Sequence, residues 1–208
     1  IDCTASSVVD LLDLHDHNLR GNIPDDLGLF TSLTVLSVSG NTLTGTIPLT
    51  LSRLTALQGL YLWTNALTGT VPSSLSQLKS LADLDFAGNE LHGTIPDALG
   101  LLTELIYLSL DRNAMTGTIP SSLGQLTKMD WFGVSDNLLS GTIPSEMSNW
   151  SNLRYAYFFK TNLTGTMPLC AINKTFDYLV ADCMKVNCTC CTHCCPAAFN
   201  GIPEFEFC

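Results

Sequence analysis

Residues 43–48 read LTGTIP, and close variants of this hexapeptide recur every 24 residues along most of the 208-residue chain. Each copy has a glycine followed three residues later by a proline. These pairs are Gly21/Pro24, Gly45/Pro48, Gly69/Pro72, Gly93/Pro96, Gly117/Pro120, Gly141/Pro144 and Gly165/Pro168. A unit of this length cannot bury its apolar residues alone, so it must stack on its neighbours. The period therefore predicts a solenoid of seven repeats over residues 8–168.

Each unit carries apolar positions that can point inward. In the second unit they are Leu33, Leu36, Val38, Leu43 and Ile47, and the third unit repeats them as Leu57, Leu60, Leu62, Leu67 and Val71. Alternation at residues 36–38 predicts a short strand that pairs in parallel with the next coil. The glycine predicts a turn, and the proline begins an outer segment whose leucine spacing favours a 3₁₀ or helical turn. The predicted fold class is an α/β-type solenoid, mostly β with short outer turns.

One polar column is expected to be buried by this stacking. It consists of Asn41, Asn65, Asn89, Asn113 and Asn137. A buried amide can donate to and accept from backbone groups that a turn leaves unpaired. We interpret the column as a structural ladder, replaced at its ends by His17 and Thr161 because terminal coils lack one neighbour.

These residues carry a family resemblance. The spacing L-x-x-L-x-L-x-x-N-x-L-x-G-x-I-P resembles the plant-type extracellular leucine-rich repeat over residues 8–168. The resemblance implies a curved, right-handed solenoid with a parallel sheet on its concave face and a second set of short strands at the L-x-G-x-I-P segment. The family includes receptor ectodomains and inhibitors of secreted enzymes, so the resemblance also implies a binding protein.

Residues 1–7 resemble the end of the N-terminal cap of that family, G-V-x-C. The sequence contains no initiator Met, signal stretch or apolar transmembrane run. Cys3 is the odd member of nine cysteines, and the resemblance implies a partner further upstream. A free thiol, or one paired with the tail, is the alternative.

The remaining cysteines lie within residues 169–208. They are Cys170, Cys183, Cys188, Cys190, Cys191, Cys194, Cys195 and Cys208. A metal cluster could use these thiolates together with His193. We favour a disulfide-rich C-terminal cap, with no metal, because this density beside glycosylation sequons is typical of an oxidising compartment. The pairing cannot be deduced from the sequence. Residues 179–195 also resemble tails of secreted leucine-rich-repeat proteins of diatoms and related algae.

Four N-x-S/T sequons all follow residue 148. Their asparagines are Asn149, Asn162, Asn173 and Asn187. Together with the cysteines they predict an extracellular glycoprotein, secreted or at the cell surface.

Composition and motifs exclude several other classes. A net charge of −10 argues against nucleic acid or an anionic membrane as partner, and we expect no direct membrane insertion by this fragment. The chain has no phosphate loop, nucleophile motif or metalloenzyme motif, so we predict no enzyme activity and no cofactor. Asp83 and Asp85 are interpreted as surface residues. The cluster of Asp13, His15, Asp16 and His17 is interpreted as closing the first coil rather than binding a metal.

Between the inward leucines, alternate side chains should face solvent on the concave side. They form three outward columns: Leu11, Val35, Gly59, Asp83, Tyr107, Trp131 and Tyr155; Asp13, Ser37, Tyr61, Asp85, Ser109, Gly133 and Tyr157; His15, Ser39, Trp63, Ala87, Asp111, Ser135 and Phe159. Aromatic residues gather in coils five to seven, where Arg112, Arg154 and Lys160 also lie.

Exposed aromatic residues near arginine are typical of binding hot spots. We predict a concave site for a protein, peptide or polysaccharide, centred on coils five and six. Its residues are Tyr61, Trp63, Tyr107, Asp111, Arg112, Asp130, Trp131, Tyr155, Tyr157 and Phe159. Alternatively, cross-strand aromatic pairs stabilise the sheet, or the cysteine-rich tail covers them.

A threonine column follows the turn glycines. Its members are Thr46, Thr70, Thr94, Thr118, Thr142 and Thr166. A regular threonine lattice resembles ice-binding surfaces, although threonine also suits strands. The leading interpretation is an extracellular recognition module, as a receptor ectodomain or secreted binder. The alternatives are a structural cell-surface or matrix protein and an ice- or mineral-binding protein.

Overall fold

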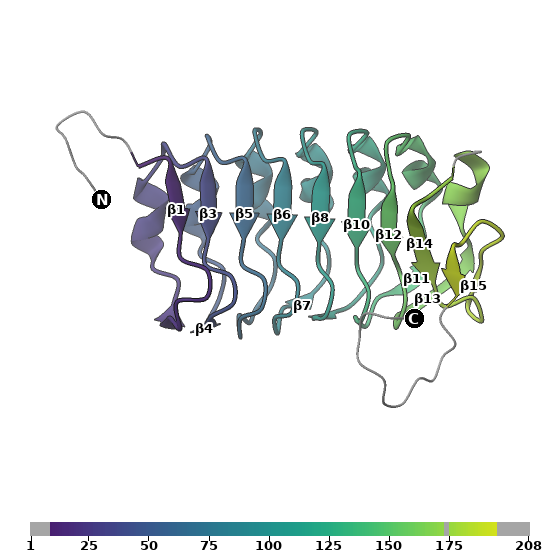
Figure 1. The fold of residues 1–208 in the computed structure, drawn as a ribbon, viewed down its shortest axis with the longest axis horizontal. Helices are drawn as coiled ribbons and strands as arrows, with labels where there is room; N and C mark the ends of the chain where they lie inside the picture. Colours follow the sequence, from purple (N-terminus) through teal and green to yellow (C-terminus); the bar gives the residue numbers. More distant parts are fainter. Residues whose placement is uncertain (1–8, 173–174, 195–208) are drawn as a thin grey trace.

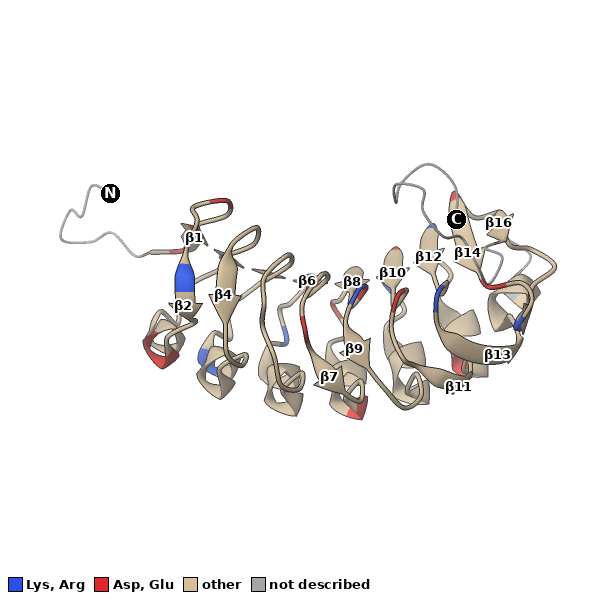
Figure 2. Ribbon diagram, turned by 90° about the horizontal axis from the view of Figure 1, so that it is seen from below, with Lys and Arg blue, Asp and Glu red and all other residues tan. Residues whose placement is uncertain are grey.

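The computed structural model of the chain describes residues 9–172 and 175–194 (Figure 1). In this part the chain winds into stacked coils that form an arc, with strands along the inner side and short helical turns along the outer side (Figure 2). The predicted solenoid fold is confirmed. Among the described residues, no helix has the length and apolar character that crossing a bilayer requires.

The concave side of the arc is one parallel sheet. Its described strands, in spatial order, are β1 (Leu11–Asp13), β3 (Val35–Ser37), β5 (Gly59–Tyr61), β6 (Asp83–Asp85), β8 (Tyr107–Ser109), β10 (Trp131–Gly133), β12 (Tyr155–Tyr157), β14 (Tyr178–Ala181) and β16 (His193–Cys194). From β1 to β12 the register advances by one 24-residue repeat per strand, as in Trp131 opposite Tyr155. The residues of each outward column therefore lie side by side.

A second set of short strands lies at the turn segments. They are β2 (Arg20–Asn22), β4 (Thr42–Thr44), β7 (His92–Gly93), β9 (Ala114–Met115), β11 (Ser140–Thr142), β13 (Asn162–Thr166) and β15 (Val186–Asn187). They pair in parallel as β2–β4, β7–β9 and β11–β13–β15, and Thr46 and Thr68 add an isolated bridge in the described chain. This confirms the second sheet and shows that it is divided.

Each repeat closes through a 3₁₀ turn on the convex side. These are η1 (Asp25–Leu29), η2 (Leu49–Arg53), η3 (Ser73–Gln77), η4 (Asp97–Leu101), η5 (Ser121–Gln125), η6 (Ser145–Asn149) and η7 (Pro168–Ile172). The repeat prolines stand in extended conformation immediately before the first six turns, for example Pro72 with φ −68°. Proline suits this place because its fixed φ leads into the turn and no N–H is left unpaired.

The core is a single apolar column inside the coils. Leu36, Leu60 and Leu84 are fully buried, as are their equivalents Leu108 and Phe132. Each such side chain contributes about 1.5–3 kcal/mol through burial. Because every repeat supplies the same positions, each coil covers the apolar faces of the coils on either side of it.

The asparagine column forms a hydrogen-bonded ladder. Asn65 donates through Nδ2 to the carbonyl oxygens of Val38 (3.0 Å) and Leu62 (3.1 Å). Its Oδ1 accepts from the N–H of Leu43 at 3.0 Å. The same three bonds recur at Asn41, Asn89, Asn113 and Asn137. Each amide thus ties its own turn to the preceding coil.

The ladder changes residue type at the C-terminal end. Thr161 occupies the next position, and its hydroxyl donates to the carbonyl of Phe158 at 2.9 Å. The buried carboxylate of Asp182 accepts from the N–H groups of Lys160 (3.2 Å) and Thr161 (3.3 Å). Lys185 Nζ lies 3.9 Å from Asp182 Oδ2 and offsets this buried charge. The described part of the tail therefore continues the solenoid.

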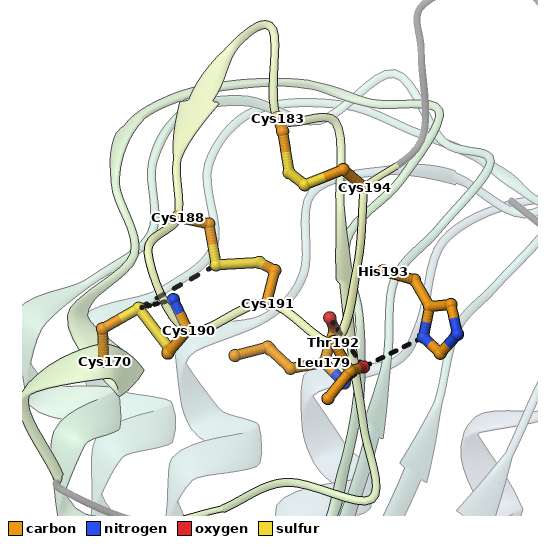
Figure 3. Close-up of a disulfide and its surroundings, with 9 residues drawn as sticks. All are labelled: Cys170, Leu179, Cys183, Cys188, Cys190, Cys191, Thr192, His193 and Cys194. Carbon is orange, nitrogen blue, oxygen red and sulfur yellow. Dashed lines mark hydrogen bonds between the residues drawn. A yellow bond between two sulfur atoms is a disulfide. The ribbon is translucent and has the colours of Figure 1, made fainter.

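Three disulfides hold these last described coils together (Figure 3). They join Cys170 to Cys190, Cys183 to Cys194 and Cys188 to Cys191. Beside them, Leu179 and Thr192 exchange hydrogen bonds that pair β14 with the segment leading into β16. Cys3, Cys195, Cys208, Asn173 and the predicted cap remnant at residues 1–7 lie outside the described residues.

Candidate functional site

Three rings from neighbouring strands form a contiguous surface on the concave sheet. Tyr107 of β8 stacks on Trp131 of β10 with ring centroids 4.4 Å apart and planes at 15°. Tyr157 of β12 packs against Trp131 with ring centroids 5.3 Å apart and planes at 40°. We call Tyr107, Trp131 and Tyr157 the aromatic row. All three side chains are partly exposed, so the row offers rigid apolar contact area at little entropic cost.

A second group of rings extends the surface toward the C-terminus. Tyr155 stacks on Tyr178 of β14 at 6.1 Å, and Tyr178 stacks on His193 of β16 at 5.3 Å. Sequence reasoning did not place Tyr178 or His193 on this surface, and it considered His193 only as a candidate metal ligand. The signal was weak because Tyr178 pairs with Tyr155 at a spacing of 23 residues instead of 24.

Asp111 lies beside the aromatic row, next to the ring of Trp131. A β-carbon built on Gly133 would overlap the Asp111 carboxylate and would lie 2.6 Å from Cη2 of Trp131. Since position 133 has no side chain, the carboxylate and the edge of the indole ring share that space. The electropositive edge of an aromatic ring is a favourable neighbour for a carboxylate.

Neutral groups donate to the two inner carboxylates. Asp111 accepts from the hydroxyl of Ser109 (3.0 Å) and from the N–H of Ser135 (2.7 Å). Asp85 accepts from the N–H of Ala87 (3.0 Å) and from the hydroxyl of Tyr107 (3.3 Å). Burial is the main cause that raises the pKa of Asp85, and it raises the pKa of Asp111 to about 7. The same burial, with the nearby carboxylates, raises the pKa of Tyr107 well above its usual range.

Tyr61 and Trp63 lie apart from the aromatic row. The Tyr61 ring covers Gly59, and its hydroxyl donates to Oδ2 of Asp83 at 2.8 Å. Trp63 is 38% exposed. The acidic strand β6 separates both residues from Tyr107. Asp83 and Asp85 are not the plain surface residues that the sequence predicts. Both are partly buried between tyrosines of the flanking strands.

The other predicted site residues surround the row. Arg154 holds Asp130 through two hydrogen bonds, from Nε at 2.5 Å and from the terminal nitrogen at 2.7 Å. Its guanidinium lies 5.3 Å from the centroid of the Tyr155 ring. Arg112 is exposed at a turn with φ +54°, and Phe159 is partly exposed just beyond β12.

The threonine column occupies the segment of the second sheet. Its methyl groups rest on the turn glycine of the next coil. A β-carbon on Gly69 would lie 2.8 Å from Thr46 Cγ2, and the relation recurs for Gly93 with Thr70, Gly117 with Thr94, Gly141 with Thr118 and Gly165 with Thr142. This contact restricts each threonine rotamer and makes the column regular. Thr70, Thr94 and Thr118 are exposed.

Other predicted sites are placed as follows. The sulfurs of Cys170, Cys188 and Cys190 lie within 4.8 Å of one another, but all three form disulfides and so offer no thiolate to a metal.

Asn149, Asn162 and Asn187 are exposed. At the first coil, His15 bonds to Asp13 at 2.8 Å, and the backbone N–H of His17 donates to the Asn41 amide at 3.1 Å.

Comparison with known proteins places this geometry in a family. The family description "Leucine rich repeat" matches residues 31–91, and a second leucine-rich-repeat description matches residues 104–126. No curated protein matches the chain.

Several solved structures are similar to the chain. One is the leucine-rich-repeat ectodomain of the plant membrane receptor kinase GASSHO1/SCHENGEN3 from Arabidopsis thaliana, in complex with CASPARIAN STRIP INTEGRITY FACTOR 2. It is 33% identical with a TM-score of 0.76, over 81% of this chain and 20% of that one. The plant peptide hormone receptor RGFR1 in complex with RGF2 is 32% identical with a TM-score of 0.63, over 78% of this chain and 31% of that one.

A plant ice-binding protein is 26% identical with a TM-score of 0.62, over 82% of this chain and 62% of that protein. The chain thus spans less than two thirds of each of these three structures. Its repeats, its sheet arrangement and these similarities agree, and the chain belongs to the plant-type extracellular leucine-rich-repeat family.

Proposed function

We propose that this chain is an extracellular recognition module that binds a peptide ligand along the concave face of coils five to seven. The observation that carries the proposal is the aromatic row, which is partly exposed on a rigid sheet. Stacked aromatic residues on regular strands form a pre-organised surface, and binding to it requires little ordering of the receptor. Aromatic residues of this kind dominate the energetics of protein interfaces.

Two further observations support a peptide as the ligand class. One of the similar structures is the plant peptide hormone receptor RGFR1 in complex with RGF2. The concave sheet here continues from β1 to β16, which gives an extended chain a long track. The three disulfides and the exposed sequon asparagines support an extracellular location.

The test is a selection of short peptides from a random displayed library, followed by hydrogen-exchange mapping of the strongest binder. We expect the bound peptide to protect amides of β8, β10 and β12. Protection confined to the second sheet, or selection of no peptide above background, would contradict the proposal.

Ice binding is the second candidate, and the threonine column favours it. The methyl–glycine contacts hold successive threonines in one repeated arrangement, and a plant ice-binding protein is among the similar structures. Ice recrystallisation assays test this candidate. Inhibition that disappears in the Thr70→Lys/Thr94→Lys protein and persists in Trp131→Ala would assign function to the threonine column.

A further inference from the structure

The concave face carries an unbalanced charge. Over β1 to β12 the three outward columns contain Asp13, Asp83, Asp85 and Asp111, one histidine and no lysine or arginine. The described basic residues of coils five to seven all lie outside these columns; they are Arg112, Lys128, Arg154 and Lys160. Of these, Arg154 is already bound to Asp130 and Lys128 to Glu104. The surface beside the aromatic row is therefore complementary to a cationic partner.

Asp85 and Asp111 belong to one connected group. Ser109 of β8 lies opposite Asp85 of β6, and its hydroxyl donates to Asp111 Oδ2 at 3.0 Å. Tyr107, an end of the aromatic row, donates to Asp85. The donors that the structure provides to both carboxylates are neutral, so part of the cost of burying their charge is not compensated.

An unsatisfied hydroxyl lies next to this group. Ser135 is 2% exposed, and its Oγ has no hydrogen-bond partner within the described chain, which is also true of Ser39 Oγ and Ser74 Oγ. Its column was predicted to face solvent, but Ser135 is buried, and its N–H donates to the carboxylate of Asp111. Because Ser39 shows the same unpaired hydroxyl far from Asp85 and Asp111, the hydroxyl of Ser135 does not by itself indicate a ligand.

We propose that the peptide bound along the aromatic row is basic, and that one of its arginine or lysine side chains docks against the carboxylates of Asp85 and Asp111. This inference rests on the proposed function and names its ligand class. The guanidinium or ammonium donates N–H hydrogen bonds to the two carboxylates. The peptide backbone and apolar side chains then lie on Tyr107 and Trp131.

Docking of a cation also couples binding to pH. The ionisable groups that face Asp111 are Asp85 from β6, Tyr107 from β8 and Tyr157 from β12, while Arg112 follows it in the chain and is exposed. A bound cation favours the ionised carboxylate, so the complex binds fewer protons than the free protein. The affinity for a basic peptide should therefore rise as the pH increases from about 5 to about 8, through the pKa of Asp111.

The test uses matched peptide pairs. Peptides selected from the random library are resynthesised with each arginine replaced by citrulline, or each lysine by acetyl-lysine, which removes the charge and keeps most of the shape. We expect the charged member to bind about tenfold more tightly, and this ratio to fall to about threefold or less in Asp85→Asn and in Asp111→Asn. Asp97→Asn, which removes the same charge from the convex turn η4, should leave the ratio unchanged. Unfolding midpoints establish that each variant is folded.

Failure of this inference differs from failure of the proposed function. If both members of a pair bind equally and Trp131→Ala weakens both, the concave face binds peptides but the cationic contact is wrong. The same conclusion follows if the selected peptides contain no lysine or arginine. If Trp131→Ala weakens neither member, the proposed function itself is overturned.

Discussion

The carboxylate of Asp111 occupies the space that a side chain on Gly133 would fill, next to the edge of the Trp131 ring. This relationship joins the acidic group to the aromatic row through one glycine. Gly133→Ala should therefore push Asp111 and Trp131 apart and lower the free energy of unfolding by about 1–3 kcal/mol, the usual effect of overpacking. Urea unfolding measures this change.

The control for that prediction is a double-mutant cycle with Asp111→Ala. With the carboxylate gone, Gly133→Ala should lose most of its effect, because the remaining contact is with the far edge of one ring. Equal effects in both backgrounds would mean that the two positions do not share this space.

The buried carboxylates should make stability depend on pH. Burial raises the pKa of Asp111 from 3.8 to about 7, so between these values the folded state holds a proton that the unfolded state has lost. The contribution of this proton to the free energy of unfolding is fully present below about pH 4 and is lost as the pH rises to about 7. Asp85 contributes in the same direction. Asp111→Asn should flatten this decline in unfolding experiments at a series of pH values, whereas Asp97→Asn on η4 should preserve it.

The asparagine ladder should be essential to the stacking of coils. Asn89→Ala would leave the N–H of Leu67 and the carbonyl oxygens of Leu62 and Phe86 without their partner. Each unsatisfied buried group costs about 1–3 kcal/mol, so we expect a loss of at least about 2 kcal/mol in unfolding free energy. Thr116→Ala removes one exposed hydroxyl contact and should cost less than about 0.5 kcal/mol. Similar losses in the two variants would show that the ladder is not specially stabilising.

The disulfides should differ in their contribution to the C-terminal coils. Cys170 and Cys190 are 20 residues apart, whereas Cys188 and Cys191 are three apart. In the chain-entropy account the longer loop gives more stabilisation, typically about 2–4 kcal/mol. Replacing Cys170 and Cys190 by serine should accelerate hydrogen exchange in β14 and leave β3 and β5 unchanged. A larger effect from replacing Cys188 and Cys191 would contradict this ranking.

The regular part of the molecule could be predicted because every repeat imposes the same spacing. Leu36 and Leu60 lie opposite each other since the chain advances one period per strand. Prediction was less successful where the period changes. Tyr178 extends the outward column after 23 residues, and Asp182 closes the ladder with a carboxylate instead of an amide. Neither position matches the repeat pattern, so the tail could be predicted only as a cap.

The candidate site was predictable in outline but not in its contacts. Alternation along strands places Tyr107, Trp131 and Tyr157 on one face, and the structure brings them together. The position of Asp111 depends on the missing side chain of Gly133, a relationship between residues of adjacent coils that no single repeat reveals.

The most direct test of the account compares peptide affinity in two variants by titration calorimetry, using the strongest binder from the library. Trp131→Ala should weaken binding by about 2 kcal/mol, or about 30-fold, and should remain folded because the ring lies outside the leucine core. The Thr70→Lys/Thr94→Lys protein should bind as the unchanged chain does. Normal binding by Trp131→Ala, together with loss of binding in the double lysine variant, would move the functional surface to the threonine column and contradict the account.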